Sequence, residues 1–269
     1  MLAYMTGQID AKASVSPDAR NSREYGRAGL FGILTPQGNP TVEPEMRVLL
    51  PTRSAMLVSR LTSRCGSLRE RLVEYSDRLG DYIAHFDGVR FDAVAFACTG
   101  SSYLIGPETE RRRIAAIEDT KGYPIITAAA AIEAALHRLG AASLALISPY
   151  PSWLTEASRA HWERAGFRIS ALLQLPSGQG ETYGIYGLTS ETILRIAADF
   201  GPGGADAVLV TGTGMPSLRT ILALEPRLGI PVLSSNLCLA WILADKLGIA
   251  AAGAESRLLG GWAERLAIA

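Results

Sequence analysis

The chain has little of what marks several specialised classes of protein. Its 269 residues include only three cysteines and three histidines, and their spacing is typical of neither a disulfide framework nor a metal site. Basic and acidic residues number 26 each, so the basic excess of a nucleic-acid or membrane-surface binder is missing. No apolar run approaches the roughly 20 residues that a membrane span needs. We therefore expect no metal site, no nucleic-acid partner and no membrane partner.

The N-terminus lacks the basic region and apolar run of a signal peptide. We expect residues 1–24 to form a flexible polar tail. We also expect a cytoplasmic protein, because an odd number of cysteines without a framework suits a reducing compartment. The net charge of zero does little to oppose self-association, so a homo-oligomer remains open.

The rest of the chain alternates short apolar runs with helical patterns. Strands are predicted at or within residues 27–35, 55–58, 93–97, 123–127, 143–149, 168–173, 205–217 and 230–236. Helices are predicted over residues 67–86, 106–119, 128–139, 153–165, 189–198, 237–247 and 254–267. This alternation is typical of an α/β protein, in which helices cover both faces of parallel sheets.

The two halves of the chain repeat the same landmarks in the same order. GILTP (32–36) matches ALISP (145–149), FDAVAFACTGSS (91–102) matches ADAVLVTGTGMPS (205–217), and YPIIT (123–127) matches IPVLS (230–234). We predict two similar, pseudo-symmetric α/β domains, 25–140 and 141–253, with the active site in the cleft between them. The helix expected within residues 254–269 is a candidate to complete the N-terminal domain.

Cys98 ends the buried strand predicted at 93–97. The residues TGSS (99–102) follow it with hydroxyl and backbone N–H donors, and a helix is expected to begin close behind. Such donors can lower the pKa of a thiol and can hold an anion. Cys98 is therefore the candidate catalytic residue, weighed against the ordinary interpretation of a buried cysteine as a small core residue.

The matching turn of the second half reads Gly212-Thr213-Gly214 and carries no thiol. Its GTG is too short to be a dinucleotide-binding fingerprint. Two-base racemisation needs an acid and a base on opposite faces of one carbon, whereas a single thiol can serve only one face.

The other reactive residue types receive structural interpretations. Cys238 falls on an apolar helix face, and Cys65 lies in a charged segment without a recognisable acid, base or metal-ligand partner. We expect Glu43 and Glu45 to cap a following helix rather than to take part in chemistry. The three histidines fall in helical patterns away from strand ends, and we expect structural or surface roles for His85, His137 and His161.

Three stretches of the chain resemble the aspartate/glutamate racemase superfamily, in particular its maleate isomerase and arylmalonate decarboxylase branch. GILTPQGNPTVEPEM (32–46) is similar to the first-strand loop of that branch, AFACTGSS (95–102) to its first cysteine motif, and LISPY (146–150) to the opening of its second half. The resemblance spans about residues 25–250 and implies two similar α/β domains, a site between them, and neither a metal nor an organic cofactor.

The resemblance also implies roles for individual residues. Cys98 would attack an alkene, while Asn39 and Tyr150 would hold carboxylates. The rest of the expected substrate-binding set is Thr99, Gly100, Gly212, Thr213 and Gly214. The chain departs from the family where the second motif has glycine in place of cysteine; the decarboxylases have the mirror arrangement, with their one cysteine in the second motif.

These features favour a cofactor-independent isomerase- or racemase-type enzyme that acts on a small carboxylate or dicarboxylate with one catalytic cysteine. A malonate-type decarboxylase and a non-catalytic carboxylate-binding relative remain open. A periplasmic-type binding protein also has two α/β lobes, but the missing export signal and the strand-end cysteine argue against it. The sequence does not identify the substrate.

Overall fold

The structure, a computed structural model, describes residues 23–176 and 183–268. The first half contains β1 (Gly29–Pro36), α2 (Val42–Leu49), β2 (Ser54–Leu61), α3 (Leu68–Asp77), α4 (Leu79–Ala84), β3 (Ala93–Phe96), α5 (Thr99–Ile105), α6 (Pro107–Lys121), β4 (Ile125–Thr127) and α7 (Ala128–Arg138). The second half contains β5 (Ser143–Ser148), α8 (Ser152–Arg164), β6 (Arg168–Gln174), α9 (Tyr183–Tyr186), α10 (Ser190–Ile196), β7 (Ala207–Val210), α11 (Leu218–Leu228), β8 (Val232–Ser234) and α12 (Ser235–Asp245), and α13 (Ala263–Ala267) ends the chain.

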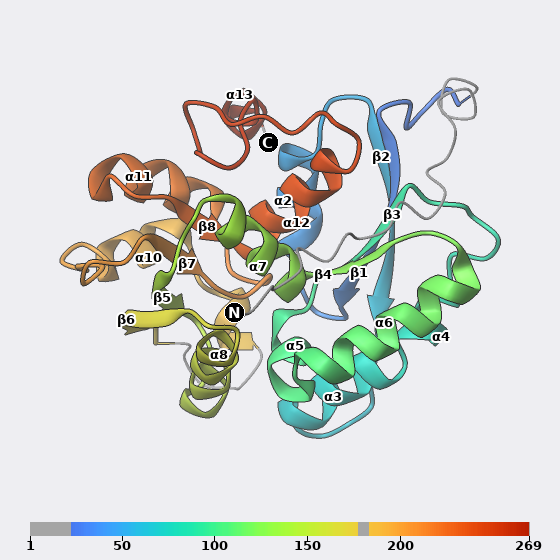
Figure 1. Cartoon of the computed structure of the whole chain (residues 1–269), viewed down its shortest axis with the longest axis horizontal. Helices are drawn as coiled ribbons and strands as arrows, with labels where there is room; N and C mark the ends of the chain where they lie inside the picture. Colours follow the sequence, from blue (N-terminus) through green and yellow to red (C-terminus); the bar gives the residue numbers. More distant parts are fainter. Residues whose placement is uncertain (1–22, 177–182, 269) are drawn as a thin grey trace, which may run out of the picture.

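The strands form two four-stranded parallel sheets, one in each half of the chain (Figure 1). Their orders, β2-β1-β3-β4 and β6-β5-β7-β8, are the same topology repeated. The strands β3, β5 and β7 are buried at every position, because helices cover both faces of each sheet. The prediction of two similar parallel-sheet α/β halves is confirmed.

The repetition extends to side-chain contacts at the start of each sheet. The carboxylate of Asp92, just before β3, accepts a hydrogen bond of 2.9 Å from the N–H of Leu30 in β1. The carboxylate of Asp206, just before β7, accepts one of 2.8 Å from the N–H of Ser143 in β5. Each half therefore uses an aspartate to join the start of its first strand to the start of its third.

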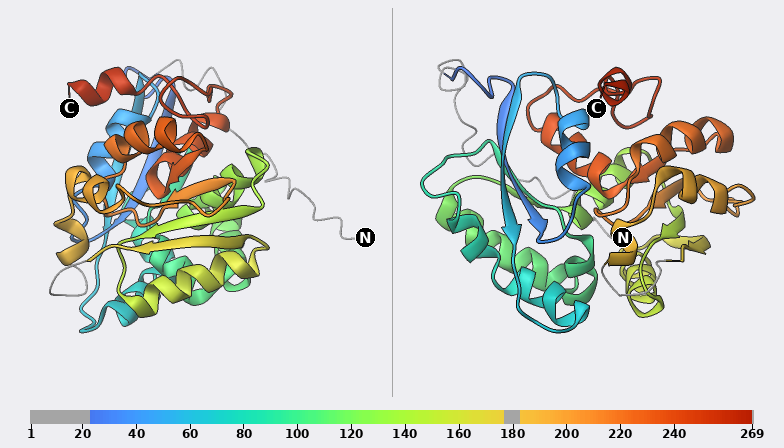
Figure 2. Two further views of the ribbon diagram at one scale, coloured as in Figure 1. Left: turned by 90° about the vertical axis from the view of Figure 1, so that its left-hand side faces the viewer. Right: turned by 180° about the vertical axis from the view of Figure 1, so that it is seen from behind.

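Helices from the two halves pack against each other along the middle of the molecule. Figures 1 and 2 show α2 and α12 between the two sheets, and α12 packs on both α2 and its own counterpart α7. Cys238 lies on α12 and is fully buried, which confirms its interpretation as a core residue. The two halves therefore share a central layer of packed helices.

The helical predictions needed three corrections. The pattern over 67–86 forms two helices, α3 and α4, which are separated at Arg78, where the backbone leaves helical geometry (φ −102°, ψ 20°). The prediction omitted α11, whose apolar spacing is interrupted near its end by Pro226. Several strand limits also moved, most clearly at β2, which is twice as long as predicted because it pairs with β1 along its whole length.

The third correction concerns the C-terminus, where the helix expected over 254–267 is reduced to α13. The preceding segment folds back on itself, and a Cβ placed on Gly260 would lie 2.4 Å from the Cα of Gly253. The guanidinium of Arg265 in α13 donates a 2.7 Å hydrogen bond to the carbonyl of Val48 in α2. The C-terminus thus contacts the first half, while the domain limits at 25–140 and 141–253 stay predictions.

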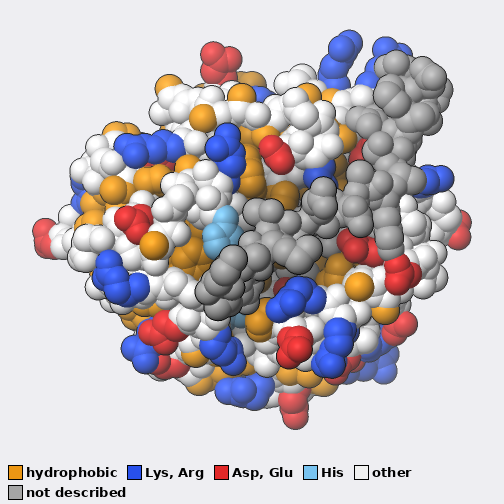
Figure 3. All heavy atoms as spheres, in the orientation of Figure 1, with side chains coloured by type: hydrophobic (Ala, Val, Ile, Leu, Met, Phe, Trp, Pro, Cys, Tyr) orange, Lys and Arg blue, Asp and Glu red, His pale blue; other side chains and the backbone are white. Residues whose placement is uncertain are grey.

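Acidic and basic side chains are intermingled on the face shown in Figure 3, and neither sign forms a continuous patch there. No helix within residues 23–176 and 183–268 is long and apolar enough to cross a membrane.

Candidate active site

The candidate site lies where the loops after β1, β3, β5 and β7 meet. In each sheet the chain leaves the two central strands in opposite directions, and this opens a crevice at their carboxyl ends. The two crevices share one cavity of about 290 Å³. Its lining includes every residue predicted for the site: Cys98, Asn39, Thr99, Gly100, Tyr150, Gly212, Thr213 and Gly214.

Cys98 and Gly212 occupy equivalent positions in the two halves. Phe96 ends β3 in register with β1, and Val210 ends β7 in register with β5. Cys98 and Gly212 each follow two residues later, and both line the cavity. The expectation that these two strand ends face one cleft is confirmed.

The thiol of Cys98 is 3% exposed, and its Sγ lies 3.2 Å from the Oγ of Ser101. Burial raises the pKa of Cys98 to about 11. The hydroxyl and backbone N–H of Ser101 and the N–H of Gly100 lower this pKa, but they do not offset the burial. The expectation of a lowered pKa is therefore wrong, because neutral donors stabilise a thiolate less than loss of water destabilises it. Cys98 is a protonated thiol at neutral pH.

The raised pKa has a measurable consequence for the reactivity of Cys98. We expect its alkylation by iodoacetamide to accelerate about tenfold per pH unit from pH 7 to pH 10, because only the thiolate reacts. The rate is measured by mass spectrometry of the Cys98 peptide over a pH series, and free cysteine supplies the reference curve. A plateau near pH 7 would show that the thiol is already ionised there.

The polar side chains of the cavity pair across the two halves. The hydroxyl oxygens of Thr99 and Tyr150 lie 2.9 Å apart. The amide Nδ2 of Asn39 donates a hydrogen bond of 3.2 Å to Oγ1 of Thr213, which itself donates to the carbonyl of Ala97 at 2.9 Å. Burial raises the pKa of Tyr150 well above its usual value, so the phenol stays neutral. The cavity therefore offers neutral donors from both halves beside the thiol.

The side chain of Asn39 is held in one orientation by the loop after β1. Its Oδ1 accepts hydrogen bonds from the N–H groups of Thr41 at 2.9 Å and Val42 at 3.2 Å, at the start of α2. Because these two donors fix the carbonyl end of the amide, the Nδ2 end is directed at the cavity. The loop sequence thus explains both the start of α2 and the direction of the amide donor.

Gly212 has a backbone conformation that excludes most other residues. Its φ is +96°, in the region that L-residues rarely adopt. A Cβ at this position would lie 3.1 Å from Cγ of Pro149 and 3.2 Å from the hydroxyl oxygen of Tyr150. The phenol of Tyr150 thus lies beside the position where a second thiol would have to begin.

A cysteine introduced at Gly212 should consequently not restore a two-thiol site. We expect Gly212→Cys and Gly212→Ala each to lose about 1–2 kcal/mol of stability from the positive φ, and to lose activity because Tyr150 is displaced. Gly229→Ala is the matched control, since φ there is +71° but a Cβ would meet nothing within 4 Å. The readouts are urea denaturation and turnover. A Gly212→Cys variant with full stability and new proton exchange on both faces of a substrate would contradict this account.

The sequence analysis did not predict one wall of the cavity. The helix α3 places one face on the cavity, formed by Leu68, Arg71, Leu72 and Tyr75. Their spacing of three and four residues is the signal of a helix face, but the same spacing is also that of an ordinary core face. This wall also brings a permanent positive charge, that of Arg71, to the cavity.

Tyr186 of α9 forms another part of the lining that was not predicted. A Cβ on Gly214 would lie 2.5 Å from Cε1 of Tyr186, so glycine is required for the ring to approach this closely. The glycine-rich connection predicted over 176–187 lies partly outside the described residues, and its described end contributes Ile185 and Tyr186 to the cavity.

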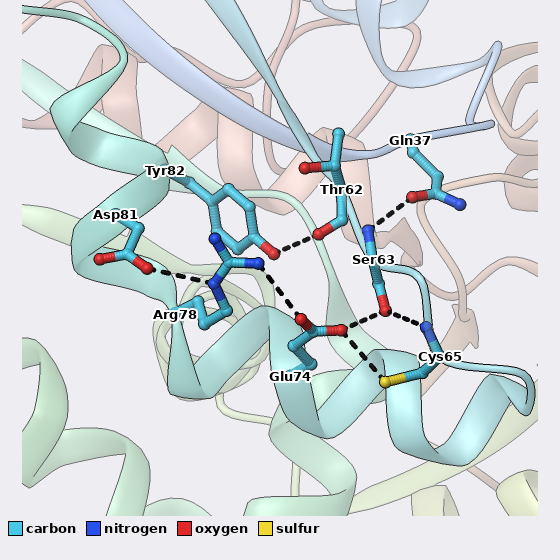
Figure 4. A network of polar contacts seen from close by, with 8 residues as sticks. All are labelled: Gln37, Thr62, Ser63, Cys65, Glu74, Arg78, Asp81 and Tyr82. Atoms are coloured by element: carbon cyan, nitrogen blue, oxygen red, sulfur yellow. Dashed lines mark hydrogen bonds and ion pairs between the residues drawn. The ribbon is translucent and has the colours of Figure 1, made fainter.

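Cys65 has an acidic partner, contrary to the sequence interpretation. Its thiol donates a hydrogen bond of 3.2 Å to Oε2 of Glu74 on α3 (Figure 4). The same carboxylate accepts from Ser63 and lies 3.2 Å from Arg78. Ser63 also donates its N–H to the side chain of Gln37 at 2.7 Å, which ties this network to the loop after β1. Neither Cys65 nor Glu74 lines the cavity.

Glu43 and Glu45 do not act alike. Glu43 forms a half-buried ion pair with Arg60 at 2.6 Å. Glu45 is buried and accepts hydrogen bonds from the N–H of Ser217 at 2.5 Å and from Nδ2 of Asn236 at 2.7 Å. Burial raises the pKa of this carboxyl against the effect of its donors. Glu45 thus caps a helix, as expected for its type, but that helix is α11 of the other half.

The histidines are structural or surface residues, as predicted. His161 is buried between the rings of Tyr103 and Trp162, and burial lowers its pKa to about 4. His137 lies on the surface of α7. Within residues 23–176 and 183–268, no group of three or more His, Cys, Asp or Glu side chains could hold a metal ion.

Two matching α/β halves, with a thiol at one of two facing strand ends, are typical of the aspartate/glutamate racemase-type enzymes. The chain belongs to the arylmalonate decarboxylase family, whose model matches residues 38–259. It is 27% identical over 221 residues to the maleate isomerase of Geobacillus stearothermophilus. This alignment covers 76% of this chain and 86% of that protein. The resemblance to the maleate isomerase and arylmalonate decarboxylase branch is confirmed.

Solved structures of maleate isomerases share the fold. The maleate isomerase Iso from Pseudomonas putida S16 superposes with a TM-score of 0.78 at 22% identity, over 86% of this chain and 98% of that one. A mutant of the Nocardia farcinica maleate cis-trans isomerase, with a covalently bound succinylcysteine intermediate, superposes with a TM-score of 0.75 at 24% identity, over 84% of this chain and 96% of that one.

Proposed function

We propose that the protein is a cofactor-independent cis–trans isomerase of a small unsaturated dicarboxylate of the maleate type, with Cys98 as its one catalytic thiol. The observation that carries the proposal is the thiol at the end of β3, inside a cavity whose strand-end wall offers neutral hydrogen-bond donors for a carboxylate from both halves. The likeness to maleate isomerases supports the substrate class.

Substrate binding is assigned to the donors beside Cys98. Asn39 uses one amide hydrogen on Thr213 and can direct the second at a carboxylate oxygen. The contact between Thr99 and Tyr150 uses one of their two hydroxyl protons, so the pair can donate as well. Hydrogen bonds to a carboxylate are stronger than those between neutral groups, and in a partly enclosed cavity they meet little competition from water.

The chemistry then needs one thiol only. The sulfur of Cys98 forms a bond to one alkene carbon, and the thiol proton passes to the neighbouring carbon while the π bond breaks. The former double bond becomes a single bond and can rotate. Elimination breaks the carbon–sulfur bond, returns a proton to the sulfur and restores the alkene in the trans form. Because the thiol is protonated at neutral pH, it supplies the proton that the addition requires, and the sulfur attacks with thiolate character as that proton leaves it. The donors stabilise the charge that develops on the carboxylate during both transfers.

The experiment is to incubate the protein with maleate and follow fumarate by proton NMR, with acid quenching and mass spectrometry of the Cys98 peptide. We expect fumarate to accumulate and a succinyl adduct to appear on Cys98. Absence of both products at high protein concentration would overturn the proposal.

Two of the assigned donors can be removed singly. We expect Asn39→Ala and Tyr150→Phe each to weaken transition-state binding by about 1–3 kcal/mol, which is about 5- to 150-fold in kcat/KM. Tyr82→Phe is the matched control, because the Tyr82 hydroxyl donates to the carbonyl of Thr62 outside the cavity. Unchanged kinetics in Asn39→Ala and Tyr150→Phe would remove these residues from the site.

A second candidate is the decarboxylation of a substituted malonate. It is favoured by the family of the chain and by the apolar lining from Leu68, Leu72, Leu154 and Ile185, which could hold an aryl group. One thiol can protonate one face of the resulting enediolate. Release of carbon dioxide from phenylmalonate, with one enantiomer formed from a methyl-substituted analogue, would favour this candidate over the isomerase.

We retain the cytoplasm as the proposed location, and the free state of all three cysteines supports it. A homo-oligomer also remains a proposal.

A further inference from the structure

The cavity has two chemically different walls. The strand-end wall carries the neutral donors of Asn39, Thr99 and Tyr150 beside the thiol. The α3 wall carries Arg71 together with the apolar side chains of Leu68 and Leu72. Among the described residues that line the cavity, Arg71 is the one with a permanent charge.

Arg71 lies on the face of α3 that lines the cavity. Arg71 and Tyr75 lie one helical turn apart on the same face, about 6 Å along the axis. Burial raises the pKa of the Tyr75 phenol and keeps it neutral, although the charge of Arg71 opposes that rise. Arg71, Tyr75 and Cys98 all line the same cavity, so a small molecule bound beside Cys98 can extend toward Arg71.

A guanidinium in such a place has a specific use. The two carboxylates of a cis-alkene diacid carry two negative charges, and the neutral strand-end donors compensate neither charge fully. A guanidinium offers a planar fork of donors that matches a carboxylate, and its attraction is stronger in a partly enclosed cavity than in water.

We propose that Arg71 binds the distal carboxylate of the substrate and thereby selects dicarboxylates over monocarboxylates. The proximal carboxylate is bound at the strand ends, and the alkene lies between the two walls against Cys98. This inference rests on the proposed function, because it assigns the second end of the same dicarboxylate.

The test compares two ligands that differ in one charge. Succinate is a dianion, and succinamate has the same chain with one carboxylate replaced by an amide. Their dissociation constants are measured by calorimetry for the wild type, Arg71→Met, Arg71→Lys and Arg69→Met. Arg69 is the matched control, since it lies on α3 outside the cavity lining, exposed, with its guanidinium 4.5 Å from the ring centre of Trp153.

We expect Arg71→Met to weaken succinate binding by 10- to 100-fold and succinamate binding by less than threefold, with Arg71→Lys between Arg71→Met and the wild type. Arg69→Met should leave the ratio of the two constants unchanged. Equal losses for both ligands, no loss for either, or failure of the wild type to bind succinate would overturn the inference.

Because binding is measured without turnover, the two proposals can fail separately. If the wild type converts maleate and the Arg71→Met variant still prefers succinate, the isomerase proposal is retained and the role of Arg71 is rejected. If the preference for succinate is lost in Arg71→Met but the wild type does not convert maleate, the role of Arg71 is retained and the isomerase proposal is rejected.

Discussion

Replacing Cys98 by alanine is expected to lower maleate turnover by roughly 10³-fold or more while the protein stays folded. The proposed reaction passes through a bond to this sulfur, and the equivalent position in the other half is glycine, so no second thiol can take over. The removed atom lies at a strand end against the cavity, and its loss should cost little stability. The measurements are fumarate formation and thermal unfolding of the same preparations.

The other two cysteines provide controls for this result. Cys238→Ala removes a fully buried sulfur from α12, so it should lower stability by about 1 kcal/mol or more with little change in turnover. Cys65→Ala removes a thiol outside the cavity and should leave turnover near that of the wild type. Wild-type turnover in Cys98→Ala would reject the mechanism. Loss of turnover in all three variants would show that turnover depends on the stability of the fold and not on the Cys98 thiol.

Glu45→Ala is expected to lower the free energy of unfolding by roughly 2–4 kcal/mol, at about 1–3 kcal/mol for each buried donor left without a partner. The carboxylate of Glu45 accepts hydrogen bonds from Ser217 and Asn236, on the opposite half of the molecule, and all three residues are buried. Its loss would leave buried donors without partners and uncap α11. Urea denaturation measures the change.

Glu43→Ala is the control for Glu45→Ala, since both residues lie in the first turn of α2 and carry the same charge. The ion pair of Glu43 with Arg60 is partly exposed, so its loss should cost no more than about 1 kcal/mol. If the two substitutions lower the free energy of unfolding equally, the buried contacts of Glu45 between the halves do not contribute to stability.

The duplicated architecture could be predicted from sequence because it depends on local patterns that occur twice. Buried parallel strands require continuous apolar runs, and the turns after them require small residues. The matched positions of Cys98 and Gly212 followed from counting along two copies of one unit. The same signals did not show that residues 251–262 form an irregular loop, because the close approach of Gly253 and Gly260 is a contact between backbones that no periodicity records.

The sequence by itself determined that the protein has two matched α/β halves and one strand-end thiol beside neutral donors. Only the tertiary structure decided the electrostatic state of that thiol, because burial is a property of the assembled cavity and raises the pKa of Cys98 where neighbouring donors alone would lower it. The partner of Glu45 and the placement of Arg71 on the cavity wall were also decided there. Both depend on which faces of α2 and α3 meet the rest of the molecule, and a helical pattern specifies a face without specifying what lies opposite it.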